Sequence, residues 1–153
     1  MAAYGYLVNH NRVVVSTAIT IMQIKAGAAA ALDIAEVQLY QTLSETSQQE
    51  VVQLVRKTAA ATVTSFTPLK LNAGDPTAAA VGGTAATGIT GTAEGTDGDV
   101  LDEWGFNVLN GMAWVYIPEL RIHVAAAGII GVKFPVAPAS ATWTGRVKFL
   151  EQQ

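Results

Sequence analysis

The sequence contains no cysteine and few charged residues, and both absences limit the functions open to it. Without cysteine there is no disulfide scaffold, no thiol nucleophile and no thiolate ligand for a metal ion. Charged residues make up 14% of the 153 residues, against about 25% in an average soluble domain. A weakly charged surface is tolerated where other chains cover it, so the composition favours a protein that assembles.

Clusters of basic residues are also missing. The net charge is −3, and the lysines and arginines are scattered along the chain, with Arg56-Lys57 the single adjacent pair. Binding to a phosphate backbone requires concentrated positive charge. We therefore expect no nucleic acid among the partners of this protein.

The chain has no apolar run of the roughly 20 residues that a membrane-spanning helix needs. The apolar run over residues 13–24 is shorter than that and contains Ser, Thr and Gln. No Lys or Arg precedes Arg12, so the charged region that opens a signal peptide is missing. These features predict a soluble chain that is made in the cytoplasm and has no membrane partner.

The sequence does contain many short runs of apolar and β-branched residues separated by turn residues. Over residues 35–39 apolar and polar side chains alternate, which is typical of a half-buried strand. The other expected strands are residues 13–24, 60–66, 104–109, 112–117, 121–124, 129–134 and 143–150. This pattern predicts an all-β protein, an antiparallel β-sandwich for which we favour a jelly roll. We expect one domain over residues 13–153, preceded by an N-terminal arm over residues 1–12.

Two segments depart from the simple strand pattern. Ser47 and Glu50 have the spacing of a helix capping box, but the β-branched alternation of residues 47–57 favours a strand, which we predict. Residues 73–98 consist mainly of Ala, Gly and Thr. Because so few large apolar side chains cannot form much core, we expect this segment to be a long surface loop.

Residue patterns that carry chemistry are scarce. The chain has no G-x-S-x-G elbow, no phosphate-binding loop and no G-x-G-x-x-G motif, and its two histidines, His10 and His123, lack metal-ligand spacing. Five carboxylates in residues 94–103 offer oxygen ligands for Ca²⁺, but their spacing differs from an EF-hand and a solvated acidic loop explains them. We expect no catalytic residue, no cofactor, no metal site and no enzyme activity.

Asn110-Gly111, between two alternating runs, is the strongest hairpin signal in the chain. A two-residue turn there pairs Phe106 with Val115. One face of the hairpin would then be core, and it would contain Trp104, Phe106, Val108, Ala113, Val115 and Ile117. The other face carries Trp114 and Tyr116, whose amphipathic rings suit a partly buried contact with a partner.

Several stretches of the sequence resemble small structural proteins that tailed-phage genomes encode. They are FNVLNGMAWVYIPELR, APASATWTGRVKFLEQQ, LYQTLSETSQQEVVQLVRKT and SFTPLKLNAGDP, and the likeness extends over residues 34–153. The resemblance implies a viral structural protein, a capsid decoration or cement protein that binds and stabilises the outer face of the capsid. It also implies the major capsid protein and other copies in a homotrimer as partners, and a location on the virion after synthesis in the host cytoplasm.

On this view the N-terminal arm would attach the protein to the shell, with Tyr4, Tyr6 and Leu7 as contact residues beside Trp114 and Tyr116. The alternative is that these residues begin the first strand of their own subunit. Other functions remain open: a tail, neck or fibre component, a jelly-roll trimer that binds a receptor, or a carbohydrate-binding sandwich. In the last case Trp114 and Tyr116 would form the sugar platform.

Overall fold

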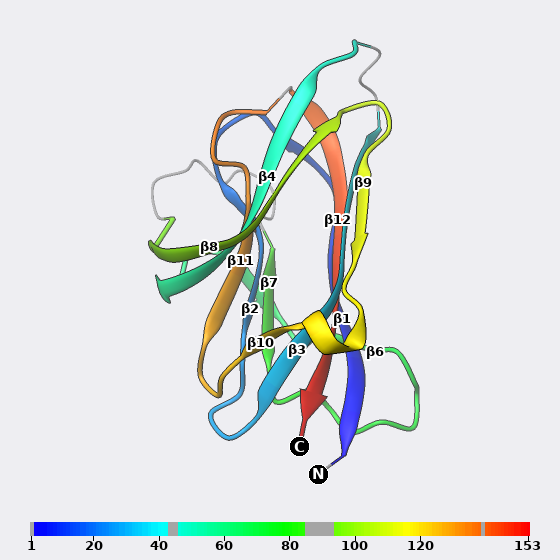
Figure 1. Ribbon diagram of the computed structural model, residues 1–153, viewed down its shortest axis with the longest axis vertical. Helices are drawn as coiled ribbons and strands as arrows, with labels where there is room; N and C mark the ends of the chain where they lie inside the picture. Colours follow the sequence, from blue (N-terminus) through cyan, green and yellow to red (C-terminus); the bar gives the residue numbers. More distant parts are fainter. Residues whose placement is uncertain (1, 43–45, 85–93, 139) are drawn as a thin grey trace.

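The structure, a computed structural model, describes residues 2–42, 46–84, 94–138 and 140–153, which form two facing β-sheets (Figure 1). Sheet A contains β1 (Ala3–Val15), β3 (Ala31–Thr42), β6 (Leu69–Lys70), β9 (Met112–Val115), β10 (Ile122–Val124) and β12 (Ala141–Gln152). Sheet B contains β2 (Thr20–Lys25), β4 (Gln49–Ala59), β5 (Thr64–Phe66), β7 (Val81–Thr84), β8 (Thr96–Asn107) and β11 (Ile129–Lys133). The single helical element in this part of the chain is the short 3-10 helix η1 (Pro118–Leu120). The predicted all-β antiparallel sandwich is confirmed, as is a strand over most of residues 47–57.

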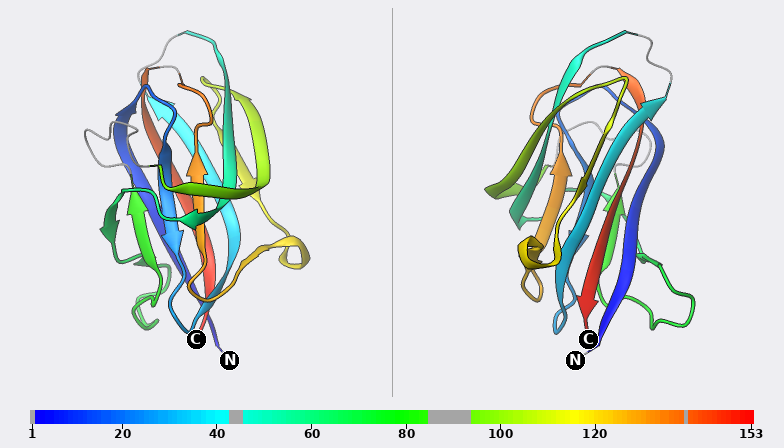
Figure 2. Two further views of the ribbon diagram at one scale, coloured as in Figure 1. Left: turned by 90° about the vertical axis from the view of Figure 1, so that its left-hand side faces the viewer. Right: turned by 45° about the vertical axis from the view of Figure 1, so that its right-hand side comes forward.

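The strands pair in a nested order. In sheet A the order is β10-β3-β12-β1-β6, with β9 also on β3, and in sheet B it is β5-β7-β2-β11-β4-β8. Thus β1 pairs with β12, β2 with β11, β3 with β9 and β10, and β4 with β8. Both chain ends therefore lie at the same end of the molecule (Figures 1 and 2), where Ala2 and Gln153 exchange backbone hydrogen bonds.

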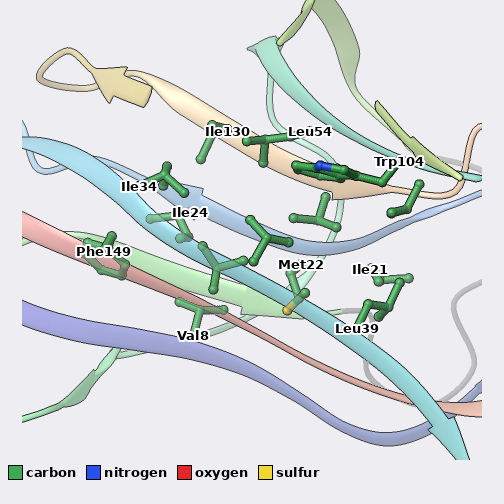
Figure 3. Packing of buried hydrophobic residues seen from close by; sticks show 14 of the residues in the cluster. Val8, Ile21, Met22, Ile24, Ile34, Leu39, Leu54, Trp104, Ile130 and Phe149 are labelled. Atoms are coloured by element: carbon green, nitrogen blue, oxygen red, sulfur yellow. The ribbon is translucent and has the colours of Figure 1, made fainter. Parts of the chain in front are cut away.

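The core lies between the two sheets and draws residues from both (Figure 3). In β12 buried and partly exposed side chains alternate along the strand, so every second residue points into the core. The ring of Trp143 is fully buried, with the ring of Phe134 at 4.9 Å and that of Phe106 edge-on at 6.1 Å. These aromatic contacts join β12 of sheet A to β8 and to the end of β11 in sheet B.

The prediction of an N-terminal arm is wrong. Residues 3–15 form β1, which pairs with β12 from Ala3 opposite Gln152 to Val15 opposite Ala141. Residues 13–24, expected as one strand, are divided between β1 and β2, with a break at residues 16–19 where the chain passes to the other sheet. The polar stretch from Asn9 to Arg12 concealed the alternation, because a fully buried His10 occupies an inward position.

The loop predicted over residues 73–98 is partly strand. Val81–Thr84 form β7, which pairs with both β2 and β5, and β8 begins at Thr96. A Cβ atom on Gly82 would lie 2.6 Å from Val8 Cγ2, and one on Gly83 would collide with Val63. The two glycines therefore allow β7 to approach its neighbours closely. Residues 73–80 form turns and bends without a strand, as predicted, and residues 85–93 lie outside the described residues.

The predicted hairpin at Asn110-Gly111 is also wrong, since β8 pairs with β4 in sheet B and β9 pairs with β3 in sheet A. The backbone N–H groups of Asn110 and Gly111 both donate to the carbonyl oxygen of Asn107, at 3.0 and 3.1 Å. Leu109 N donates to Asn107 Oδ1 at 2.9 Å, and Gly111 has φ +66°. The turn therefore takes up more than two residues and carries the chain from one sheet to the other.

This longer turn reverses the faces predicted for β9. Trp104, Phe106 and Val108 are buried as predicted. The residues predicted to complete that core face, Ala113, Val115 and Ile117, are exposed. Met112 packs against the core and Tyr116 is buried, so the inward positions of this strand are the even-numbered ones.

Replacing Phe106 by Ala tests the core contact. Because Phe106 is buried and packs edge-on against Trp143, we expect Phe106→Ala to lower the free energy of unfolding by about 3–5 kcal/mol. The control is Leu109→Ala, at an exposed position of the same turn, for which a change within about 0.5 kcal/mol is expected. Chemical denaturation measures both, and equal midpoints would contradict the assigned core.

His10 provides a second test. Its side chain is fully buried, both ring nitrogens lack a hydrogen-bond partner within the described part of the chain, and burial lowers its pKa from 6.5 to about 4. The unfolded chain binds the proton more readily than the folded chain. The free energy of unfolding therefore keeps the full contribution of neutral His10 above pH 6.5 and loses it as the pH falls towards 4. The difference between these two pKa values corresponds to a loss of roughly 3 kcal/mol in the free energy of unfolding.

We therefore expect His10→Leu to show a smaller fall in unfolding free energy between pH 7 and pH 4 than the parent protein. Urea denaturation at a series of pH values measures the difference. His123→Asn is the control, because His123 is an exposed histidine beside Asp33 and its removal should leave most of the acid-dependent fall in place. An identical pH profile for His10→Leu and the parent would contradict the burial of a neutral imidazole.

Candidate contact surface

One edge of sheet A is formed by β9, η1 and β10 in succession. β9 pairs with β3 from Glu36 opposite Val115 to Leu39 opposite Met112, and β10 pairs with the earlier part of β3. The segment from β9 to β10 thus follows a single strand along its outer side (Figure 1). Residues 112–124 are therefore the border of the sheet.

Large apolar side chains are exposed along this border. We call them the β9 strip: Trp114 is 47% exposed, Val115 67%, Ile117 57% and Leu120 67%. Single exposed apolar residues are normal on protein surfaces, but this group is concentrated within residues 114–120. A concentrated group of exposed apolar side chains marks a site of contact with another molecule.

Contacts with sheet B hold the β9 strip in place. The ring of Trp114 lies 6.3 Å from that of Trp104 on β8, with the ring planes tilted by 47°. The Tyr116 hydroxyl donates to Asp102 Oδ2 at 3.0 Å. Burial, and then the hydrogen bond and negative charge of Asp102, raise the pKa of the Tyr116 hydroxyl well above its ordinary value. The tyrosine therefore remains a neutral donor, and β9 is tied to both sheets.

The five residues predicted as partner contacts are not brought together. Trp114 lies on the β9 strip, half exposed, whereas Tyr116 is buried and faces Asp102. Tyr6 is fully buried and donates to Pro76 O at 3.0 Å, while Tyr4 and Leu7 are partly buried on β1. For Tyr6 and Tyr116 the prediction of a partner contact is therefore wrong.

The sequence reasoning missed three residues of the strip, Val115, Ile117 and Leu120. The first two were assigned to the core because the turn before β9 was taken to be two residues long. The run WVYIPEL has apolar residues at both odd and even positions, so they occupy both faces of the strand. This pattern is the signal that could have found them. An apolar run on both faces is typical of a strand that is covered on both faces.

The predicted acidic cluster is used within the fold. Glu94 Oε2 accepts a hydrogen bond from Thr20 N at 2.5 Å. Asp97 accepts one from the fully buried amine of Lys57 at 2.6 Å and another from Lys133. Burial alone would raise the pKa of Asp97, but the hydrogen bonds and charges of the two lysines outweigh it and lower that pKa. Among the described residues, no group of three or more acidic or histidine side chains is placed to hold a metal ion.

A hollow of about 330 Å³ lies over sheet B between β4, the start of β8 and the turn from β10 to β11. Two basic residues line it. Arg56 donates to the carbonyl oxygen of His123 at 3.1 Å, and Lys57 donates to Asp97 and to the carbonyl oxygen of Glu94 at 2.7 Å. Both cations are thus engaged within the chain, so the β9 strip remains the stronger candidate for contact with a partner.

Comparison with known proteins adds no relative. No protein-family model, no curated protein and no solved structure matches the chain. In the described part of the chain, no helix has the length and apolar character needed to cross a membrane.

Replacing Asp97 tests the structural use of the acidic segment. Asp97→Asn leaves the buried Lys57 ammonium without a counter-charge. We expect a loss of about 2–3 kcal/mol in unfolding stability, somewhat below the roughly 3–5 kcal/mol of a fully buried pair because Asp97 keeps contact with water. Asp99→Asn, at an exposed position of the same strand, is the control and should change stability little. A melting temperature that rises with added Ca²⁺ and loses that response in Asp97→Asn would contradict this assignment.

Proposed function

We propose that the chain is a structural protein of a tailed-phage virion, a capsid decoration or cement protein that binds the outer face of the shell and stabilises it. The observation that carries the proposal is the β9 strip, an exposed apolar surface on a body whose acidic cluster is engaged within the fold. An exposed apolar surface of this kind serves for contact with another molecule. The sequence resemblance over residues 34–153 supplies the class of assembly in which the contact is used.

The topology supports a jelly roll, which we propose as the finer description of the fold. In sheet A the long strands run β1-β12-β3 with β9 and β10 at the edge, and they face β2-β11-β4-β8 in sheet B. Early strands pair with late ones in nested order, as in a long hairpin rolled into two sheets. Such a body is rigid, which suits a protein that must hold many identical contacts on a symmetric shell.

The geometry gives less support to carbohydrate binding. A sugar platform needs aromatic faces open to solvent, but Tyr116 is buried with its hydroxyl bonded to Asp102. The remaining ring, Trp114, leans on Trp104. Attachment through an N-terminal arm is not proposed, because residues 3–15 pair with β12 in the same subunit.

Co-sedimentation with capsid shells tests the proposal. The protein would be produced together with the major capsid protein encoded in the same genome, and the shells separated from free protein by density-gradient centrifugation. We expect the chain to sediment with the shells and to raise the temperature at which they disassemble. Leu120→Lys, at an exposed position of the strip outside β9, should weaken this attachment, since repeated modest contacts are lost together, whereas Val136→Lys, at an exposed valine outside the strip, should not. Shells that never carry the parent protein would refute the proposal.

A further inference from the structure

No second strand of the described residues pairs with the outer border of β9. Tyr116 N donates to Ala35 O on β3 at 2.9 Å, and in an antiparallel pair alternate residues direct their N–H and C=O groups to the same side. The backbone groups of Trp114 therefore also point towards β3, and those of Ala113 and Val115 point away from it. Within the described residues β9 pairs with β3 and with no second strand. Its outer side is thus an open ladder.

The edge of sheet B differs in charge. One of its two edge strands is β8, which carries Asp97, Asp99, Asp102 and Glu103. Charges on an edge strand prevent another strand from adding to it. β9 is four residues long, with the sequence MAWV, and carries no charge and no proline.

The lack of charge also indicates which strand can add to β9. When two copies of one strand pair about a two-fold axis, each residue lies opposite itself or opposite another residue of the same strand. A charged strand then repels its copy, and like charges directly opposite destabilise a pair. β9 carries no charge and so can pair with its own copy, whereas the acidic strand β8 cannot.

We propose that two copies of this chain join through β9, which pairs with β9 of the second copy in antiparallel fashion about a two-fold axis at Trp114. The outward backbone groups set the register. Ala113 exchanges both backbone hydrogen bonds with Val115 of the second copy, and Trp114 lies opposite its own copy. Sheet A then continues from one subunit into the other.

This pairing accounts for the exposure of the strip near the axis. The half-exposed ring of Trp114 lies beside the ring of the other copy, at the position where side chains of an antiparallel pair are closest. Val115 gains Ala113 of the second copy as its neighbour across the strands. The pairing needs no shell, so it goes beyond the proposed function and holds or fails separately from it.

Sedimentation velocity of the purified full chain over a range of concentrations tests the pairing. We expect a reversible monomer–dimer equilibrium. Val115→Lys places two ammonium groups near the axis and should weaken dimerisation by about tenfold or more. Val136→Lys, a control at a similarly exposed valine, should leave the equilibrium unchanged. A protein that stays monomeric, forms the trimer that the resemblance implies, or dimerises equally well as Val115→Lys would overturn the proposal.

Cysteine cross-linking tests the register, because the chain has no cysteine of its own. In the proposed pairing residues 113 and 115 of different copies are a hydrogen-bonded pair, with Cα atoms about 5.5 Å apart, which a disulfide can span. The double variant Ala113→Cys/Val115→Cys should form a covalent dimer on mild oxidation. Each single variant should not, since identical positions lie diagonally across the axis. Cross-linking by a single variant, or none by the double variant, would overturn the register.

The two proposals give distinguishable results. A dimer that never binds shells would remove the proposed function and leave the pairing intact. A shell-bound protein that is monomeric in solution would do the opposite.

Discussion

The long strands of sheet A are joined through the last strand, β12. It lies between β1 and β3 at the centre of sheet A and pairs with each of them along most of its length. Its inward side chains include Trp143 and Phe149, both fully buried. Its buried Glu151 accepts hydrogen bonds from Ala79 N at 2.9 Å and Ala80 N at 2.7 Å, which fixes the chain just before β7. Because β1 and β3 share sheet A only through β12, the sheet is complete only when the end of the chain has paired.

The position of the β9 strip follows from this nested order. Once β12 and β3 are paired, the open side of β3 is the place left for the segment that leaves β8. The turn at Asn107–Gly111 brings the chain from sheet B to that side, and Gly111 permits its left-handed backbone. β9 therefore becomes an edge strand, and within the described residues no later strand pairs with its outer side.

Alternation in the sequence was enough to predict the sandwich and most of its strands, since a strand with one buried face must alternate. It failed where a buried residue is polar, as at His10 in β1, and where small residues form a strand, as at Gly82 in β7. At the contact surface Trp114 was predicted. Val115 and Ile117 were not, because the number of residues in a turn decides which side of the next strand faces inward. That number depends on the hydrogen bonds that Asn107 accepts within the turn, which the Asn110-Gly111 pair alone does not reveal.

The contacts beneath the strip hold it in one conformation. Trp104 supports the ring of Trp114, and Asp102 accepts the hydrogen bond of Tyr116, so the strand is already held in its extended form before any partner arrives. A preorganised surface loses less conformational freedom on binding than a flexible arm does. Asp102 has a second effect. Together with the other acidic residues of β8, it gives that edge of sheet B a negative charge. The two edges that this side of the molecule offers are thus opposite in character, and only the uncharged one favours contact.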